Sequence, residues 1–215
     1  MGRLFGTDGV RSKAGEYPLD APTVRRLGSA IARVLAEVGG GPARMLVGRD
    51  TRESGAWIER ELAHGAQSAG ATLVSAGVIP TPAVAYLTPA RGFSAGLVIS
   101  ASHNPFGDNG IKVFSGSGQK FSEELESRVE SLVLDSSWAV PVGDAGPVEQ
   151  LDMRAEYSAH LRRILPSDFV CPPGRIAIDC ANGATTTVAP RLFAELGIDV
   201  RAIGCDPDGR NINLG

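Results

Sequence analysis

The sequence predicts an α/β protein in which a mixed sheet is sandwiched between helices. Short apolar runs typical of buried strands alternate with segments whose apolar residues repeat at helical spacing. Polar loops follow several of the predicted strands, and the same order of strand, loop, helix and strand recurs after residue 150. We therefore expect one complete domain over residues 1–135, a linker over 136–150 and the start of a second, similar domain over 151–215.

The elements of the first domain follow from this alternation. Pro22 and the glycines 39–41 are typical start and stop residues of a helix, and apolar residues repeat at three- and four-residue intervals between them. Ser122 can cap a further helix, with acidic residues in its first turn. Strands are expected over 44–48, 72–77, 95–100 and 111–114, and helices over 56–70 and 82–87.

Residues 136–150 lose this periodicity and gather proline and glycine, which is typical of a linker. Beyond them we expect a helix over 151–165, strands over 175–179 and 199–204, and a helix between the two strands. Gly197 and Gly204 repeat the spacing of Gly70 and Gly77. The last residues are rich in turns and add no further element, so the second domain would have a thin core. We expect the chain to be part of a longer protein.

Composition limits the classes of function. The 215 residues are 43% hydrophobic and 21% charged, with a net charge of −3, as in soluble globular proteins. No overall positive charge favours nucleic acid or a membrane surface as a partner. Pro80 and Pro82 interrupt the most apolar window, so we expect no transmembrane segment. The chain shows no secretory signal, and its cysteines lack metal-binding spacing, which predicts reduced thiols and a cytoplasmic location; they are Cys171, Cys180 and Cys205.

Three polar loops are candidates for a ligand site. In open α/β sheets, ligands bind beyond the carboxyl ends of the strands. The segments "GRDTRES" (48–54), "SASHNPFGDNG" (100–110) and "CANGATT" (180–186) all have this placement, and "GTDGVRS" (6–12) is a fourth candidate. Within them, the serines and asparagines of 100–110 could equally well satisfy backbone groups of their own loop.

Cations in or beside these loops predict a phosphate site. The guanidinium fork of arginine fits a phosphate group, and lysine supplies a mobile charge. The alternative is that each cation forms a surface ion pair with a neighbouring carboxylate. Neither a Walker motif nor a dinucleotide fingerprint is present, and Ser102 lacks the elbow motif of hydrolases. The cations are Arg11, Arg49, Arg52 and Lys112.

The stretch "SASHNPFGDNGIK" resembles the α-D-phosphohexomutase superfamily, whose hallmark is a Ser-His-Asn-Pro loop followed by Asn-Gly-x-Lys. The motifs "FGTDGVR", "VGRDTR", "GVIPTPAV" and "KVFSGSGQKF" occur in the superfamily's order between Phe5 and Phe121. They are similar to the branch that acts on glucosamine phosphates. "DCANGA" and "DPDGRNIN" extend the resemblance to the end of the chain. Ser12 departs from the glycine that usually follows "GTDGVR", which affects the geometry of that turn.

The resemblance implies that Ser102 carries a phosphoryl group and gives it to the sugar. Glucosamine 6-phosphate and glucosamine 1-phosphate would interconvert through a 1,6-bisphosphate intermediate. It implies catalytic roles in charge stabilisation and proton transfer for Arg11 and Lys112, with assistance from His103. The residues it implies in substrate and phosphate binding are Arg49, Asp50, Arg52, Asn104 and Asn109.

The resemblance also implies a Mg²⁺ cofactor and a hexosamine phosphate substrate. The phosphate on Ser102 would be one metal ligand, and the other ligands belong to an aspartate-rich loop expected after Gly215. The loops that read the sugar are expected still further along, so we expect the chain alone to lack activity. Two alternatives stay open: a phosphomannomutase or phosphoglucomutase with the same serine, and a non-catalytic module that binds sugar phosphates. An oligomer is compatible with all of them.

Overall fold

The computed structural model describes residues 4–141, 143, 146–170 and 174–214. The first domain contains, in chain order, β1 (Val10–Lys13), α1 (Ala21–Gly39), β2 (Arg44–Arg49), α2 (Gly55–Ser68), β3 (Thr72–Val78), α3 (Thr81–Ala90), β4 (Ala95–Ile99), β5 (Asp108–Ser115), α4 (Glu123–Leu134) and β6 (Glu149–Gln150). Every helix and strand predicted for this domain is present. The Ser122 cap is confirmed as well, because its side chain accepts a hydrogen bond from the Leu125 amide.

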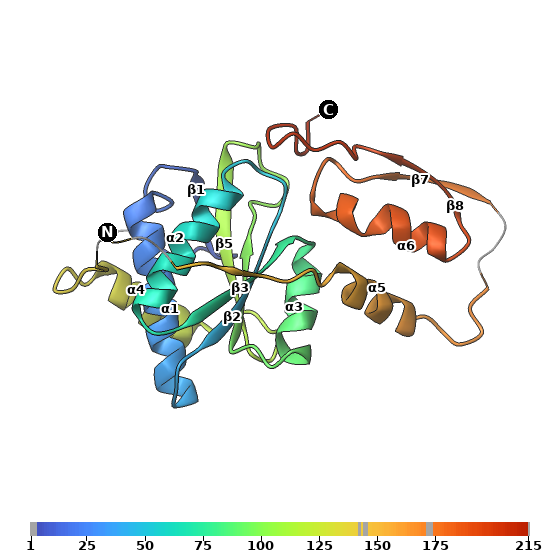
Figure 1. The fold of residues 1–215 in the computed structure, drawn as a ribbon. Coiled ribbons are helices and arrows are strands. Elements are labelled where there is room, and N and C mark those ends of the chain that lie inside the picture. Colours follow the sequence, from blue (N-terminus) through green and yellow to red (C-terminus); the bar gives the residue numbers. More distant parts are fainter. Residues whose placement is uncertain (1–3, 142, 144–145, 171–173, 215) are drawn as a thin grey trace.

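The strands form one six-stranded mixed sheet in the order β1-β5-β4-β2-β3-β6. β2 lies parallel to β3 and β4, whereas β5 is antiparallel to β4 and β1. Figure 1 shows the sheet between α1, α2 and α4 on one side and α3 on the other. The predicted α/β fold with a mixed sheet between helices is confirmed.

Two strands were not predicted. β1 was expected to be a polar loop, but it pairs with β5, with Arg11 opposite Gly110. β6 lies at the end of the predicted linker and pairs in parallel with β3, with Glu149 opposite Val74. Both are short edge strands whose backbone pairing, rather than an apolar pattern, defines them.

Successive residues of the central strands face opposite sides of the sheet and build two separate cores. Val47, Ile99 and Ile111 belong to the larger core, together with buried residues of α1, α2 and α4. Leu46 and Val98 belong to the smaller core, which they share with α3 and α5 (Arg154–Arg163). The loops at the carboxyl ends of β2 and β4 are therefore anchored from both sides.

The backbones of α1 and α2 come into direct contact at two glycines. A Cβ atom added to Gly65 would lie 1.8 Å from the carbonyl oxygen of Arg25, and one added to Gly28 would lie 2.2 Å from that of Leu62. The obstacles are backbone atoms, so side-chain rearrangement cannot relieve the overlap. The two helices could pack this closely only with glycine at these positions.

We expect Gly65→Ala to lower the free energy of unfolding by about 3 kcal/mol, because the added methyl group would force the helices apart. The matched control is Gly39→Ala at the end of α1, where an added Cβ would meet nothing within 4 Å. Urea denaturation measures both. Equal unfolding midpoints for the two variants would contradict the close packing.

Arg26 of α1 closes the carboxyl end of α4. Its guanidinium donates to the carbonyl oxygens of Val133 at 2.9 Å and Leu132 at 3.2 Å, and also to those of Asp135 and Trp138. The last carbonyls of a helix lack partners within the helix, so this side chain supplies them. Arg26 thus holds backbone carbonyls at the end of α4, away from the polar loops that are the candidates for a ligand site.

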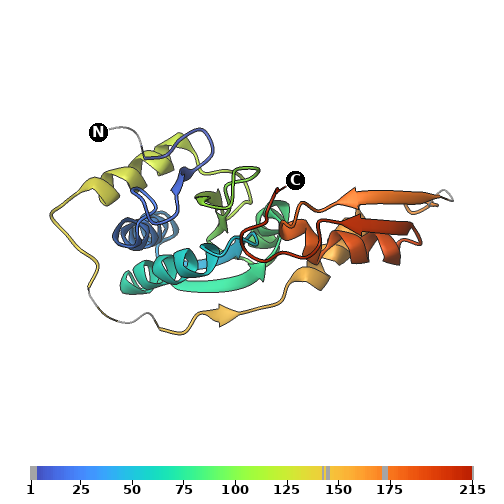
Figure 2. The same ribbon diagram turned by 90° about the horizontal axis from the view of Figure 1, so that it is seen from above.

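The second unit comprises α5, β7 (Arg175–Asp179), the 3₁₀ helix η1 (Ala184–Thr187), α6 (Ala189–Glu195) and β8 (Asp199–Ile203). β7 and β8 form a parallel two-stranded sheet. Figures 1 and 2 show this unit beside α3, where Tyr86 of α3 stacks on His160 of α5 with ring centroids 3.6 Å apart. The predicted elements are confirmed, although the central helix is split in two. No described helix is long and apolar enough to cross a membrane.

Candidate active site

The three predicted polar loops meet in one place. They enclose a cleft of about 420 Å³ between the sheet of the first domain and the second unit. The cleft is where the sequence placed it, beyond the carboxyl ends of β2, β4 and β7. Its lining comes from Asp50, Ile79, Pro80, Thr81, Pro82, Val98, Ser100, Ser102 and His103 in the first domain, and from Ala181, Gly183, Ala184, Thr185, Ile212 and Asn213 in the second unit.

Ser102 stands at the cleft as an exposed residue with an unusual backbone. Its φ angle is 58°, a left-handed conformation that costs a residue with a side chain roughly 1–2 kcal/mol. Both of its backbone polar groups are held: the N–H donates to Ser100 Oγ at 3.1 Å, and the carbonyl accepts from Arg52 at 3.0 Å. The hydroxyl is therefore presented to the cleft by a fixed backbone.

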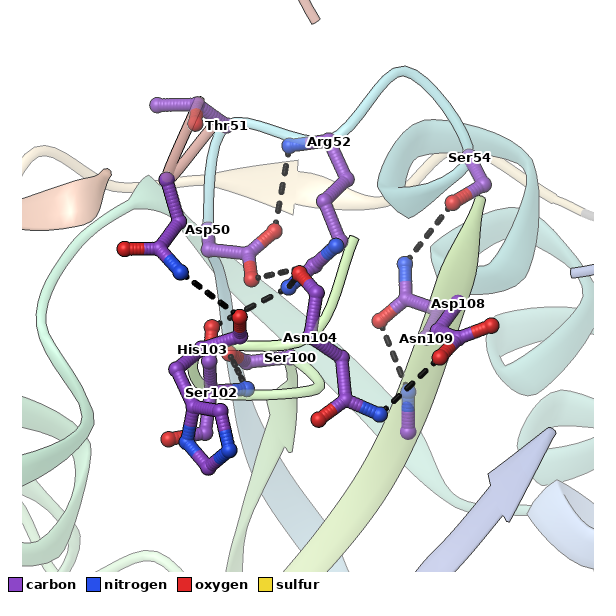
Figure 3. A network of polar contacts seen from close by, with 12 residues as sticks. Asp50, Thr51, Arg52, Ser54, Ser100, Ser102, His103, Asn104, Asp108 and Asn109 are labelled. Atoms are coloured by element: carbon purple, nitrogen blue, oxygen red, sulfur yellow. Dashed lines mark hydrogen bonds and ion pairs between the residues drawn. The ribbon is translucent and has the colours of Figure 1, made fainter. Parts of the chain in front are cut away.

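Arg52 is placed differently from its prediction. It is expected to bind substrate or phosphate, but its side chain is 0% exposed and paired with Asp50 at 3.0 Å. Its other donors go to the carbonyls of Ser102 and Asn104 (Figure 3) and to that of Pro105. With these bonds made, the guanidinium does not line the cleft, and its partners belong to the serine loop.

Asn109 also lies outside the lining of the cleft. It is fully buried, and its side chain donates to Ser54 Oγ at 2.8 Å and accepts from the Gly110 amide at 2.8 Å. It ties β5 to the start of α2 instead of facing the cleft. Asn104 is half-buried and donates to Asp108 Oδ2 at 2.9 Å, which links the two ends of the serine loop (Figure 3).

The structure brings Asp50 into the cleft but not Arg49. These neighbours in the chain face opposite sides of the sheet. Arg49 points toward α2, where Nε donates to Glu59 Oε2 at 3.2 Å and its side chain packs beside Gly55. Arg49 thus forms an ion pair, the alternative considered for each cation, but with the buried Glu59 and not at the surface.

Arg11 and Lys112 gather around Asp8. The pairing of β1 with β5 and of β5 with β4 puts both cations on the face of the sheet that carries Val98. Asp8 Oδ2 lies 2.6 Å from Arg11 Nη2 and 2.6 Å from Lys112 Nζ. A Cβ atom on Gly110 would lie 3.0 Å from Arg11 Cγ, so the glycine leaves the room in which Arg11 crosses β5.

This cluster keeps its carboxylate charged. Partial burial acts to raise the pKa of Asp8, but hydrogen bonds and positive charge from Lys112 and Arg11 outweigh it and leave the pKa lowered. Arg11 Nε is buried and has no hydrogen-bond partner among the described residues. The arrangement places positive charge along β5, the strand that follows the Ser102 loop, with one acidic partner between the two cations. Neither cation lines the cleft itself, and Arg11 and Asp8 line a separate hollow.

Sequence reasoning missed the contribution of the segment 206–214. Asp208 is a turn residue as predicted, since Oδ1 accepts from the amides of Arg210 and Asn211. The same segment also reaches the serine loop, because Asn213 Nδ2 donates to the His103 carbonyl at 2.7 Å. Ile212 and Asn213 line the cleft. The only signal for this in the sequence was the resemblance of "DPDGRNIN" to the superfamily.

Further contacts join the second unit to the loop after β2. Thr51 Oγ1 donates to the Asn182 carbonyl, and the Glu53 amide donates to the Gly209 carbonyl at 3.0 Å. Arg210 pairs with Glu53 at 2.7 Å. The same β2–α2 loop that carries Arg52 therefore also holds the far wall of the cleft.

The described residues do not form a complete metal site. Among them, no three His, Cys, Asp or Glu side chains come together in a way that could hold a metal ion. Cys180 and Cys205 are free thiols, and Cys171 lies outside the described residues. Burial, with a smaller effect of Cys205, raises the pKa of Cys180 to about 11, so this thiol stays protonated at neutral pH.

Comparison with known proteins finds a family profile and relatives that match this chain. The profile for domain I of phosphoglucomutase/phosphomannomutase, an alpha/beta/alpha domain, matches residues 2–139. The phosphoglucosamine mutase of Syntrophus aciditrophicus is 45% identical and aligns with 100% of this chain and 48% of its own length. That of Cupriavidus pinatubonensis is 44% identical, over 99% of this chain and 48% of its own.

A solved structure of a phosphoglucomutase/phosphomannomutase family protein from Burkholderia thailandensis superposes with a TM-score of 0.79. It is 27% identical in sequence, and the match covers 97% of this chain and 45% of that one. The chain spans about half the length of the curated relatives it matches. On the profile match and these similarities, the chain belongs to the phosphoglucomutase/phosphomannomutase family.

Proposed function

We propose that the protein containing this chain is a phosphoglucosamine mutase, which interconverts glucosamine 6-phosphate and glucosamine 1-phosphate. The observation that carries the proposal is Ser102, an exposed serine fixed at a cleft between two α/β units. Curated relatives at 44–45% identity that bear this name add support. The substrate is then a hexosamine phosphate.

In the proposed cycle, Ser102 begins as a phosphoserine. The bond between its Oγ and phosphorus breaks while a bond forms from phosphorus to O1 of glucosamine 6-phosphate, and the proton of that hydroxyl passes to Oγ. The 1,6-bisphosphate then turns over in the cleft. Its 6-phosphoryl group returns to Oγ, the serine proton goes to O6, and glucosamine 1-phosphate leaves with the phosphoserine restored.

Positive charge on the strand that follows the serine loop supports this chemistry. A phosphoserine carries about −1.5 to −2 charges at neutral pH, and phosphoryl transfer depends mostly on positioning and on stabilising that charge. Arg11 and Lys112 are the cations we assign to this task, and Lys112 is the group we assign to proton transfer. His103 and Asp50 line the cleft, where we assign them to the serine loop and to the substrate site. Asn104, which links the two ends of the serine loop, is assigned to the substrate site as well.

Mg²⁺ is the cofactor we propose for the whole protein, with the phosphate on Ser102 as the ligand from this chain. Mg²⁺ requires near-octahedral oxygen ligands and usually takes one or two carboxylates in addition to phosphate. The described residues do not supply such a set. The remaining ligands would therefore come from elsewhere in the protein.

We expect the 215-residue chain alone to bind Mg²⁺ only in the millimolar range, because one phosphate without grouped carboxylates is a weak site. Isothermal titration calorimetry of the phosphorylated chain measures this, with Ser102→Ala as the control that removes the phosphate. Stoichiometric micromolar binding by the chain would show that its ligand set is complete and would contradict the expectation.

The test of the function is a mutase assay of the protein expressed from its complete reading frame. Glucosamine 6-phosphate, mannose 6-phosphate and glucose 6-phosphate are compared at equal concentration, and we expect the highest kcat/KM for the glucosamine substrate. Preference for mannose or glucose would favour the phosphomannomutase/phosphoglucomutase alternative. Binding without turnover of any of the three would favour a non-catalytic module.

We further propose that the protein works in the cytoplasm, where free thiols such as Cys180 and Cys205 stay reduced. The net charge of −3 gives no support to nucleic acid or an anionic membrane surface as a partner. Self-association is compatible with the function and is tested by light scattering of the complete protein.

A further inference from the structure

We propose that Arg52 is a positioning residue for phosphoryl transfer, which acts by fixing the backbone of Ser102 and not by touching the substrate. The proposal rests on the phosphoserine function proposed above. Arg52 does not line the cleft, and its side chain is fully buried in the first domain. The proposal therefore explains why a charged residue is buried there.

The side chain of Arg52 binds several backbone carbonyls of the serine loop. Nη2 donates to the carbonyls of Ser102 at 3.0 Å and Asn104 at 2.8 Å, and Nη1 donates to that of Pro105. Nε donates to Asp50 Oδ2 at 3.0 Å (Figure 3). Three carbonyls from four consecutive residues thus converge on a single planar group, which fixes their relative directions.

Stability alone is a weak reason for this arrangement. Burying an ion pair removes two charges from water, and the attraction between them often does no more than offset that loss. Loop carbonyls at a protein surface could be satisfied by water instead. The buried pair does, however, provide a rigid fork whose position is set by Asp50 at the end of β2, so it supplies geometry that water would not.

The backbone that Arg52 holds includes that of Ser102, the reacting residue. Ser102 has a left-handed backbone, and its N–H and carbonyl are each held, by Ser100 and Arg52 respectively. Such a conformation persists only where the surroundings determine it. Releasing the carbonyl would let the peptide relax toward an ordinary conformation and would move Oγ relative to the cleft. In-line phosphoryl transfer is sensitive to such displacements.

The test uses Arg52→Lys in the protein expressed from its complete reading frame. Lysine keeps the positive charge beside Asp50, but its single nitrogen cannot reach the carboxylate and all three carbonyls. The matched control is Arg26→Lys, which also removes arginine bonds to backbone carbonyls, at the end of α4. The measured step is loading of Ser102 from a hexose 1,6-bisphosphate: the bond between phosphorus and a sugar oxygen breaks, the bond to Oγ forms, and the serine proton passes to that sugar oxygen.

We expect Arg52→Lys to slow loading at saturating bisphosphate by about tenfold to a hundredfold, measured by intact mass against time. The concentration of bisphosphate at half-maximal rate should stay unchanged, since Arg52 does not contact it. The ³¹P resonance of the phosphoserine should broaden or split as Ser102 samples several conformations. Arg26→Lys should lower the thermal midpoint about as much as Arg52→Lys does. It should leave both the loading rate and the ³¹P resonance as in the unmodified protein.

Loading at the unmodified rate with a single sharp ³¹P resonance in Arg52→Lys would overturn the proposal. If that variant does not fold, Asp50→Asn combined with Arg52→Gln removes both buried charges together, and the same slowing and line shape are expected of it. Asp50→Asn alone then measures the share that comes from the cleft lining, and an equal slowing in the single and double variants would overturn the proposal. If the unmodified protein itself takes no phosphoryl group on Ser102, the proposed function fails. The separate loading rates therefore distinguish failure of the function from failure of the positioning role.

Discussion

Ser102→Ala is expected to remove the covalent phosphate from the complete protein and to lower mutase turnover by about 10⁵-fold or more, as when the nucleophile of a covalent mechanism is deleted. Without Oγ there is no atom to carry the phosphoryl group between the two sugar positions. The remaining cleft could bind a sugar phosphate but could not exchange its phosphoryl group. Intact mass and a coupled mutase assay measure the two losses on the same preparation.

Two companion variants separate the hydroxyl from the backbone. Ser102→Gly also lacks Oγ but suits the left-handed conformation at φ 58°, so it should lose activity as fully as alanine without losing stability. Ser100→Ala removes the neighbouring hydroxyl, which accepts the Ser102 N–H. It should keep the phosphate and reduce turnover only moderately. A Ser102→Ala protein that retained its phosphate or full turnover would refute the assignment.

The periodicity of the sequence was enough to predict the central architecture. The apolar runs of β2, β3 and β4 are buried on both faces, and α1 carries a clear apolar stripe that includes Val24, Leu27 and Ile31. The strands that were missed have no such pattern. β1 presents Arg11, Ser12 and Lys13 and becomes a strand only because β5 supplies its hydrogen-bond partners. Pairing between distant segments is not encoded in a local pattern.

The candidate site was predicted to the level of its loops but not of its side chains. The rule that ligands bind beyond the carboxyl ends of strands located the cleft correctly. It could not distinguish an arginine that faces a ligand from one that holds the loop. Arg49 and Arg52 lie close together in the same polar segment, yet Glu59 of α2 pairs with one and the carbonyls after Ser102 surround the other. Both outcomes depend on residues brought together only by folding.

Lys112→Met should lower turnover of the complete protein by about 10²- to 10⁴-fold, the range for loss of a group that transfers protons or balances charge in the transition state. Lys112 is only 17% exposed and lies 2.6 Å from Asp8, on the sheet face that carries Val98 of the cleft. Methionine keeps the length and packing of the side chain but removes its charge. The control is Lys13→Met: Lys13 is an exposed lysine that pairs with Glu16 at 3.5 Å, and its loss should leave turnover unchanged.

The pH dependence tests the role of Asp8 in this cluster. Its pKa in the folded protein is lowered against the tendency of burial, by Lys112 and Arg11. A carboxyl of this kind stabilises the fold above its unfolded pKa, near 4, and that contribution is lost only as the pH falls through the lower folded value. Asp8 therefore stays ionised throughout the neutral range, and its own titration should not shape the activity profile there.

Asp8→Asn should act through Lys112 instead. Without the carboxylate, the ammonium loses the oxygen that it contacts at 2.6 Å, so its side chain is no longer held beside Arg11. Turnover of Asp8→Asn should therefore fall, but by less than that of Lys112→Met, and the double variant should be no slower than Lys112→Met alone. Losses that add up in the double variant would mean that Asp8 acts independently of Lys112.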